Sequence, residues 1–117
     1  MTRENPNTQT AAAHLLYQMK RGGIDHLLAN PGTDFPSIIE ALSADAASGA
    51  MPKALAIHHE NVAVGMAHGY YLVSGKMAAV MVHVNVGLAN CTMGALNAAS
   101  SQVPVLLMSG RSPVTEV

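Results

Sequence analysis

Four short apolar runs at near-regular intervals constrain the fold of this chain more than any other feature. They cover residues 24–29, 54–57, 78–82 and 104–109. None shows strict polar–apolar alternation, as expected of strands buried on both faces of a sheet. Their starts are 30, 24 and 26 residues apart, which leaves room for one helix between successive strands. The pattern predicts an α/β fold, with a parallel sheet flanked by helices.

Segments with helical periodicity lie before and between these runs, and their ends carry capping residues. Thr10 is placed to cap a helix that stops at residues 22–23, which are both glycine. Asp34 is placed to cap a second helix, which ends before Gly49. Serine, threonine and aspartate favour helix starts, and glycine favours helix ends.

Two further helices are expected in the second half of the chain. One begins near Glu60 and ends at Gly75. The other spans about residues 89–100 and is rich in alanine, glycine and serine. Because such side chains are small, we expect this helix to lie close against the sheet or another helix.

A length of 117 residues suits one domain. We expect residues 1–7 to be disordered. The fourth strand lies near the end of the chain, so it leaves one edge and one apolar face of the sheet uncovered. We therefore expect an incomplete domain, either a fragment or a chain completed by a partner.

The composition of the chain indicates which kinds of molecule it can bind. Half of the residues are hydrophobic and 11% are charged, against about 25% charged in a typical soluble domain, which predicts a large obligate interface. A net charge of −1 and 3% aromatic residues give no basis for nucleic-acid binding.

Membrane and secretory assignments are not supported either. The most apolar run, residues 78–82, is followed by His83 and is far shorter than the roughly 20 residues of a membrane helix. Cys91 is the single cysteine, and the first ten residues lack the pattern of a signal peptide. These features indicate a cytoplasmic protein without disulfides.

Common catalytic and metal-binding motifs do not match. His59 and Glu60 begin an H-E-x-x-H pattern, but Ala63 occupies the second histidine position. Glycine-rich phosphate loops and the G-x-S-x-G motif are absent from the sequence. His58, His59, His68 and His83 lack the spacing of metal ligands, so no metal site is expected within this chain.

Polar residues cluster where three of the predicted strands end. The clusters are residues 30–34, 58–61 and 83–90. In open α/β sheets, ligands bind at the carboxyl ends of the strands. Pro31 and Gly32 fit a tight turn that presents Thr33 to a ligand, although an ordinary strand-to-helix turn is the commoner explanation of such residues. Glu60 opens a helix, where a capping role alone also explains a carboxylate.

The stretch HHENVAVGMAHGYYLVSGKMAAVMVHVNVGLANCTMGALNAASSQVPVLLMSGRSP carries a family resemblance. Together with NPGT at residues 30–33, it resembles the pyrimidine-binding domain of thiamine-diphosphate enzymes, and the match runs from about residue 13 to 113. This group includes acetolactate synthase and benzoylformate decarboxylase. The resemblance implies the thiamin-diphosphate-binding fold, thiamine diphosphate as cofactor and a 2-keto acid as substrate.

The resemblance assigns roles to individual residues. In the family, a strand-end glutamate hydrogen-bonds N1′ of the aminopyrimidine and promotes loss of the C2 proton, a role that falls on Glu60. Such chemistry needs a carboxylate held in an apolar, water-poor pocket. We expect Pro31, Gly32 and Asn90 to join Glu60 in binding the cofactor.

Two rim residues are expected to handle the substrate. A strand-end histidine relays protons in benzoylformate-decarboxylase-like relatives, and His83 matches it. Thr33 matches a hydroxyl that these relatives place near the substrate carboxylate. In acetolactate synthases the loop after the third strand is a small-residue, Gly-Pro-Gly type sequence, so HVNVGLAN favours a decarboxylase-like site.

The resemblance also implies parts that lie outside these 117 residues. Family members bind the diphosphate and magnesium through a further domain, and a complete site needs two subunits. We therefore expect a homo-oligomer, a dimer or tetramer, that pairs through the helices starting at Glu60 and near Ala89. A non-catalytic α/β binding module of the same fold remains the alternative.

Overall fold

The structure is a computed structural model that describes residues 10–111 and residue 115. Five helices and four strands lie in this part of the chain. In order they are α1 (Ala11–Arg21), β1 (His26–Asn30), α2 (Pro36–Ala44), β2 (Lys53–Ala56), α3 (Glu60–Ser74), β3 (Ala79–Val82), α4 (Val84–Asn90), α5 (Thr92–Ser100) and β4 (Leu106–Ser109). The predicted disorder of residues 1–7 lies outside the described residues.

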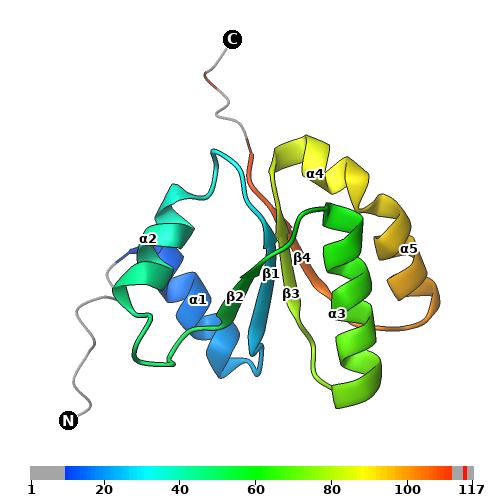
Figure 1. The fold of residues 1–117 in the computed structure, drawn as a ribbon, viewed down its shortest axis with the longest axis horizontal. Helices are drawn as coiled ribbons and strands as arrows, with labels where there is room; N and C mark the ends of the chain where they lie inside the picture. Colours follow the sequence, from blue (N-terminus) through cyan, green and yellow to red (C-terminus); the bar gives the residue numbers. More distant parts are fainter. Residues whose placement is uncertain (1–9, 112–114, 116–117) are drawn as a thin grey trace.

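The strands form one parallel sheet in the order β2-β1-β3-β4. Helices α1 and α2 cover one face, and α3, α4 and α5 cover the other (Figure 1). From β1 the chain places β2 on one side and β3 on the other, so the strand order reverses between β1 and β3. The carboxyl ends of these two strands form the edge where such sheets bind ligands, which is the upper edge in Figure 1.

Each face of the sheet has its own core. On the α1–α2 face, Leu16, Leu27 and Phe35 are buried. On the α3 face, Leu28 packs with Val64 and with Val80 and Val82 of β3. Consecutive residues of β1 serve opposite cores because strand side chains alternate. Each such side chain contributes about 1.5–3 kcal/mol by burial.

The predicted α/β class and parallel sheet are confirmed, and each predicted strand is present within two residues of its expected ends. Burial on both faces is confirmed for β3, in which every residue is buried. It is wrong for β2, whose residues are mostly exposed, and for β4, whose residues are half-buried. Both strands lie at the edges of the sheet, where no strand of the described residues pairs with their outer side.

Several predicted helix ends are confirmed. The Thr10 hydroxyl accepts a hydrogen bond of 3.1 Å from the N–H of Ala13. Gly75 ends α3 with a φ of 69°, a conformation that glycine adopts without strain. The predicted cap at Asp34 is wrong: Phe35 stands at the cap position without a side-chain hydrogen bond, because Asp34 bonds to another element.

The predicted helix over residues 89–100 is wrong in extent. Two helices, α4 and α5, occupy residues 84–100 and meet at Cys91. Helix α4 starts directly after β3, where a loop was expected. The close packing of α5 is confirmed, since a Cβ at Gly94 would lie 3.0 Å from Cβ of Val64 on α3. In the described part of the chain, no helix has the length and apolar character needed to cross a membrane.

Candidate active site

Glu60 is held at the carboxyl edge by the pairing of β1 and β2. The N–H of Ile57 donates to the carbonyl of Ala29 at 2.8 Å, which extends this pairing beyond β2. The side-chain amide of Asn30 donates to the carbonyl of Ile57 at 2.9 Å. These two bonds fix the short segment between β2 and α3, and thereby the position of Glu60 as the first residue of α3.

The Glu60 carboxylate is nearly buried, with 9% of the residue exposed. Nδ2 of Asn90 on α4 donates a hydrogen bond of 3.2 Å to Oε2 of Glu60. Nδ1 of His59 lies 4.0 Å from the same oxygen, but it accepts a hydrogen bond from the N–H of Asn61. That nitrogen therefore carries no proton, so it forms no ion pair with Glu60.

Cys91 lies beneath this site and is fully buried. Burial raises the pKa of the Cys91 thiol; a backbone hydrogen bond lowers it, and the negative charge of Glu60 raises it further. The thiol donates to the carbonyl of Leu88 at 3.2 Å. The protonated thiol is therefore part of the apolar support under α4 and is poorly suited to act as a nucleophile.

His83, the residue after β3, pairs with a carboxylate from the loop between β1 and α2. Its Nδ1 lies 2.6 Å from Oδ1 of Asp34. The other oxygen of Asp34 accepts a 3.3 Å hydrogen bond from the N–H of Val84. Burial raises the pKa of Asp34, but the hydrogen bonds from His83 and Val84 outweigh burial and hold this pKa below its ordinary value.

The backbone between β3 and α4 is strained at Val84. Its φ of 33° lies in a region that β-branched residues rarely adopt, at a cost of roughly 1–3 kcal/mol. Asp34 binds the N–H of Val84, and the Ser109 hydroxyl donates to its carbonyl at 2.7 Å. Hydrogen bonds on both sides therefore hold the strained residue in place.

Two glycines leave room for the His83–Asp34 pair. A Cβ at Gly32 would collide with the ring of His83, and a Cβ at Gly110 would collide with the carboxylate of Asp34. Strand register explains why Gly32 lies against His83 and Gly110 against Asp34, because the end of β3 aligns with the last residues of both β1 and β4. The residues that follow these strands therefore meet at one edge.

The structure brings some of the predicted site residues together. Glu60 contacts Asn90, and Gly32 packs against His83. Pro31 and Thr33 are exposed at the same edge of the sheet. The observed turn joins the carbonyl of Gly32 to the N–H of Phe35 at 3.1 Å, so it is centred on residues 33–34, two positions later than a turn centred on residues 31–32.

Sequence reasoning missed Asp34 and Ser109 as members of this cluster. Asp34 belongs to a strand-end group that was recognised, but helix capping offered a sufficient explanation for it. Ser109 ends β4, and applying the strand-end rule to the fourth strand as well would have found it. Within residues 10–111 and 115, no group of three or more His, Cys, Asp or Glu side chains is arranged to hold a metal ion.

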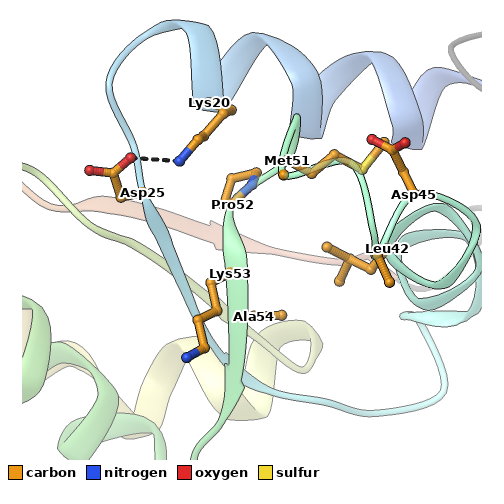
Figure 2. A pocket seen from close by; sticks show the side chains of 10 residues that line it. Lys20, Asp25, Leu42, Asp45, Met51, Pro52, Lys53 and Ala54 are labelled. Carbon is orange, nitrogen blue, oxygen red and sulfur yellow. Dashed lines mark hydrogen bonds and ion pairs between the residues drawn. The ribbon is translucent and has the colours of Figure 1, made fainter. Parts of the chain in front are cut away.

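A hollow of about 400 Å³ lies at the opposite edge of the sheet (Figure 2). Among its lining side chains, Lys20 and Asp25 pair with each other at 2.7 Å, as the dashed line in Figure 2 shows. Asp25 precedes β1 and Lys53 begins β2, so the hollow faces the amino ends of the strands. It is therefore separate from the edge that carries Glu60 and His83.

Comparison with known protein families agrees with the observed fold. The family described as "Thiamine pyrophosphate enzyme, N-terminal TPP binding domain" matches residues 9–117. The chain belongs to this family. Its parallel sheet flanked by helices is the thiamin-diphosphate-binding fold expected from the sequence resemblance.

A protein of Mycobacterium tuberculosis (strain ATCC 25618 / H37Rv) that carries the name acetolactate synthase large subunit IlvX is 34% identical over 101 residues. The match covers 85% of this chain and 18% of that protein. The acetolactate synthase large subunit of Haemophilus influenzae is 28% identical over 102 residues, which cover 87% of this chain and 17% of the relative.

Among solved structures, the thiamine diphosphate-dependent 4-hydroxybenzoylformate decarboxylase of Rhodococcus jostii RHA1 superposes with a TM-score of 0.75 at 21% identity. The superposition covers 91% of this chain and 19% of that one. At this identity the likeness shows a shared fold. The chain spans less than a fifth of the length of these three proteins.

Proposed function

We propose that this chain is the pyrimidine-binding part of a thiamine-diphosphate-dependent enzyme that decarboxylates or joins 2-keto acids. The setting of Glu60 carries the proposal. It is a carboxylate at the start of α3, nearly buried, with one hydrogen bond from Asn90. No donor among the described residues binds its Oε1, and this oxygen keeps some contact with solvent. A ligand N–H fits that oxygen.

The donors and acceptors of this edge fit the aminopyrimidine of thiamine diphosphate. Glu60 would share a proton with the ring nitrogen, and Asn90 would keep the carboxylate oriented. Pro31 and Gly32 would line the cofactor with their backbone. When bound, the cofactor supplies a nucleophilic carbon and an electron sink for loss of carbon dioxide. The protein's own part is to position and hold the proton at Glu60.

The proposed reaction type is decarboxylase-like, with His83 as proton relay and Thr33 as contact for the substrate carboxylate. His83 supports this because Asp34 binds its Nδ1 while no described residue binds its Nε2. Its side chain is 37% exposed, so Nε2 can reach a bound molecule. A proton donor or acceptor at the rim suits decarboxylation, in which carbon dioxide leaves and a proton replaces it.

Three further properties belong to the same proposal. Magnesium would be bound by residues outside this chain, together with the diphosphate. The working protein would be a homo-oligomer, which the exposed apolar side chains of α3, α4 and α5 support. A cytoplasmic location fits a chain whose single cysteine is free and buried.

The proposal is tested on the full-length protein with thiamine diphosphate and magnesium. Titration calorimetry measures cofactor binding, and assays with pyruvate and benzoylformate measure carbon dioxide release and carboligation products. We expect cofactor binding and turnover of at least one 2-keto acid. If the protein neither binds the cofactor nor turns over any 2-keto acid, it is the non-catalytic binding module instead.

A further inference from the structure

The two carboxylate oxygens of Asp34 serve two consecutive residues of another element. Oδ1 lies 2.6 Å from Nδ1 of His83, and Oδ2 accepts from the N–H of Val84 at 3.3 Å. An ionised carboxylate only accepts hydrogen bonds, so Nδ1 of His83 carries a proton. In the neutral ring, Nε2 then holds the free lone pair.

We propose that Asp34 is a positioning residue, which fixes the tautomer and the direction of His83 at the carboxyl edge of the sheet. The inference rests on the proposed function in one respect, namely that His83 handles protons during turnover. The tautomer itself is a property of this chain and can be measured without turnover.

The surroundings of the pair support a positioning role over a casual surface contact. The Asp34 side chain is only 12% exposed. Gly32 on one side and Gly110 on the other leave no room for a side chain, so both partners are confined. Val84 keeps its strained φ of 33° with its N–H bound to the same carboxylate. One carboxylate thus holds the ring and the backbone from which the ring projects.

An asparagine at position 34 would test this arrangement because it keeps the shape but has one acceptor oxygen. With its oxygen toward His83, its NH₂ group would face the N–H of Val84, and two donors would oppose each other. With the amide reversed, its NH₂ group would face Nδ1 of His83 and favour the other tautomer. Asp34→Asn therefore cannot satisfy both groups that the native carboxylate serves.

The first experiment measures the tautomer directly. Long-range ¹⁵N–¹H NMR on the full-length protein with ¹⁵N-labelled histidine reports which ring nitrogen carries the proton, and His83→Ala assigns the signal. We expect a protonated Nδ1 in the native protein and a mixture of tautomers in Asp34→Asn. A native Nε2–H tautomer would overturn the proposal. The tautomer of His83 is measured on native protein, which keeps Asp34, so this test remains valid even if Asp34→Asn does not fold.

The second experiment is a double-mutant cycle on turnover, with circular dichroism to check folding. We expect Asp34→Asn to lower kcat by about 10- to 100-fold, the range found for groups that orient metal-bound histidines. Added to His83→Ala, it should change kcat less than about twofold, because it acts through His83. Glu40→Gln, which removes an exposed carboxylate from α2, should leave kcat unchanged.

The outcomes separate this inference from the proposed function. Equal losses from Asp34→Asn with and without His83 would contradict the positioning role. A fixed Nδ1–H tautomer that depends on Asp34, combined with native turnover in His83→Ala, would support the inference and contradict the proposed proton relay.

Discussion

Asn90 on α4 donates a hydrogen bond of 3.2 Å to the carboxylate of Glu60 on α3. The two residues are thirty positions apart and come from helices that follow different strands of the sheet. The bond fixes Oε2 of Glu60, whereas Oε1 has no donor among the described residues. Glu60 is thereby presented with one oxygen held and one oxygen open to a ligand.

Replacing Asn90 should weaken the proposed cofactor chemistry. Asn90→Ala removes a hydrogen bond to a charged group, worth about 1.5–3 kcal/mol. We expect a loss of about tenfold or more in the exchange rate of the cofactor C2 proton. Asn85→Ala, at another exposed position of the same helix, is the matched control and should exchange at the native rate. Equal rates in the two variants would remove Asn90 from the site.

Asp25 should contribute stability that disappears in acid. It pairs with Lys20 at 2.7 Å and with Lys76 at 2.8 Å, and hydrogen bonds from these lysines lower the pKa of Asp25 to about 2. Because the folded pKa is depressed, the contribution is present above the unfolded value near 3.8 and is lost as pH falls toward 2.

Acid titration by circular dichroism checks this expectation. Asp25→Asn should lower the stability at pH 5 and flatten its dependence on pH between about 4 and 2, the window set by the two pKa values. The effect should be small because Asp25 and both lysines are at least partly exposed to solvent. Turnover should be unchanged, since Asp25 lies at the edge opposite Glu60. An unchanged acid profile would show that the lysine contacts contribute nothing measurable.

Cys91 should resist thiol reagents while the domain is folded. Burial and the charge of Glu60 raise the pKa of its thiol, so the reactive thiolate is scarce near pH 8. We expect the peptide that contains Cys91 to be alkylated far more slowly in native protein than in urea, as followed by mass spectrometry. Fast labelling of the native protein would mean that α4 opens readily from the sheet.

The exposed apolar residues of α3, α4 and α5 should form a subunit contact. They include Val62, Met66, Val73, Val86, Met93 and Leu96. Leu96→Glu would place a charge on this surface and should shift the protein toward monomers in sedimentation velocity. Ile39→Glu, at a similarly exposed site on α2, should leave the assembly intact. If only Ile39→Glu dissociated the protein, the subunit contact would instead lie on the face covered by α1 and α2.

The sheet and the position of Glu60 could be predicted because their signals are local. Buried strands appear as apolar runs, and a helix start after such a run is marked by its first residues. The exposure of β2 could not be read from residues 54–57, since an apolar edge strand resembles a central one. Its place in the order β2-β1-β3-β4 decides its exposure.

The partners of His83 could not be predicted because they depend on strand register. Asp34 meets His83 only because β1 and β3 end at the same level. Helix α4 was missed for a related reason. Its first residue, Val84, has a backbone conformation that valine rarely adopts. Its N–H donates to Asp34 and its carbonyl accepts from Ser109, and these hydrogen bonds hold it there.

The most direct test of the account is C2-proton exchange of bound thiamine diphosphate in Glu60→Gln, followed by NMR after acid quench. Glutamine keeps the shape of the side chain but cannot share a proton as an acid does. We predict that the variant folds and binds cofactor but exchanges about 10²- to 10⁴-fold more slowly, the usual contribution of general acid–base catalysis. Exchange at the native rate with cofactor bound would contradict the account and leave Glu60 as a helix-start carboxylate.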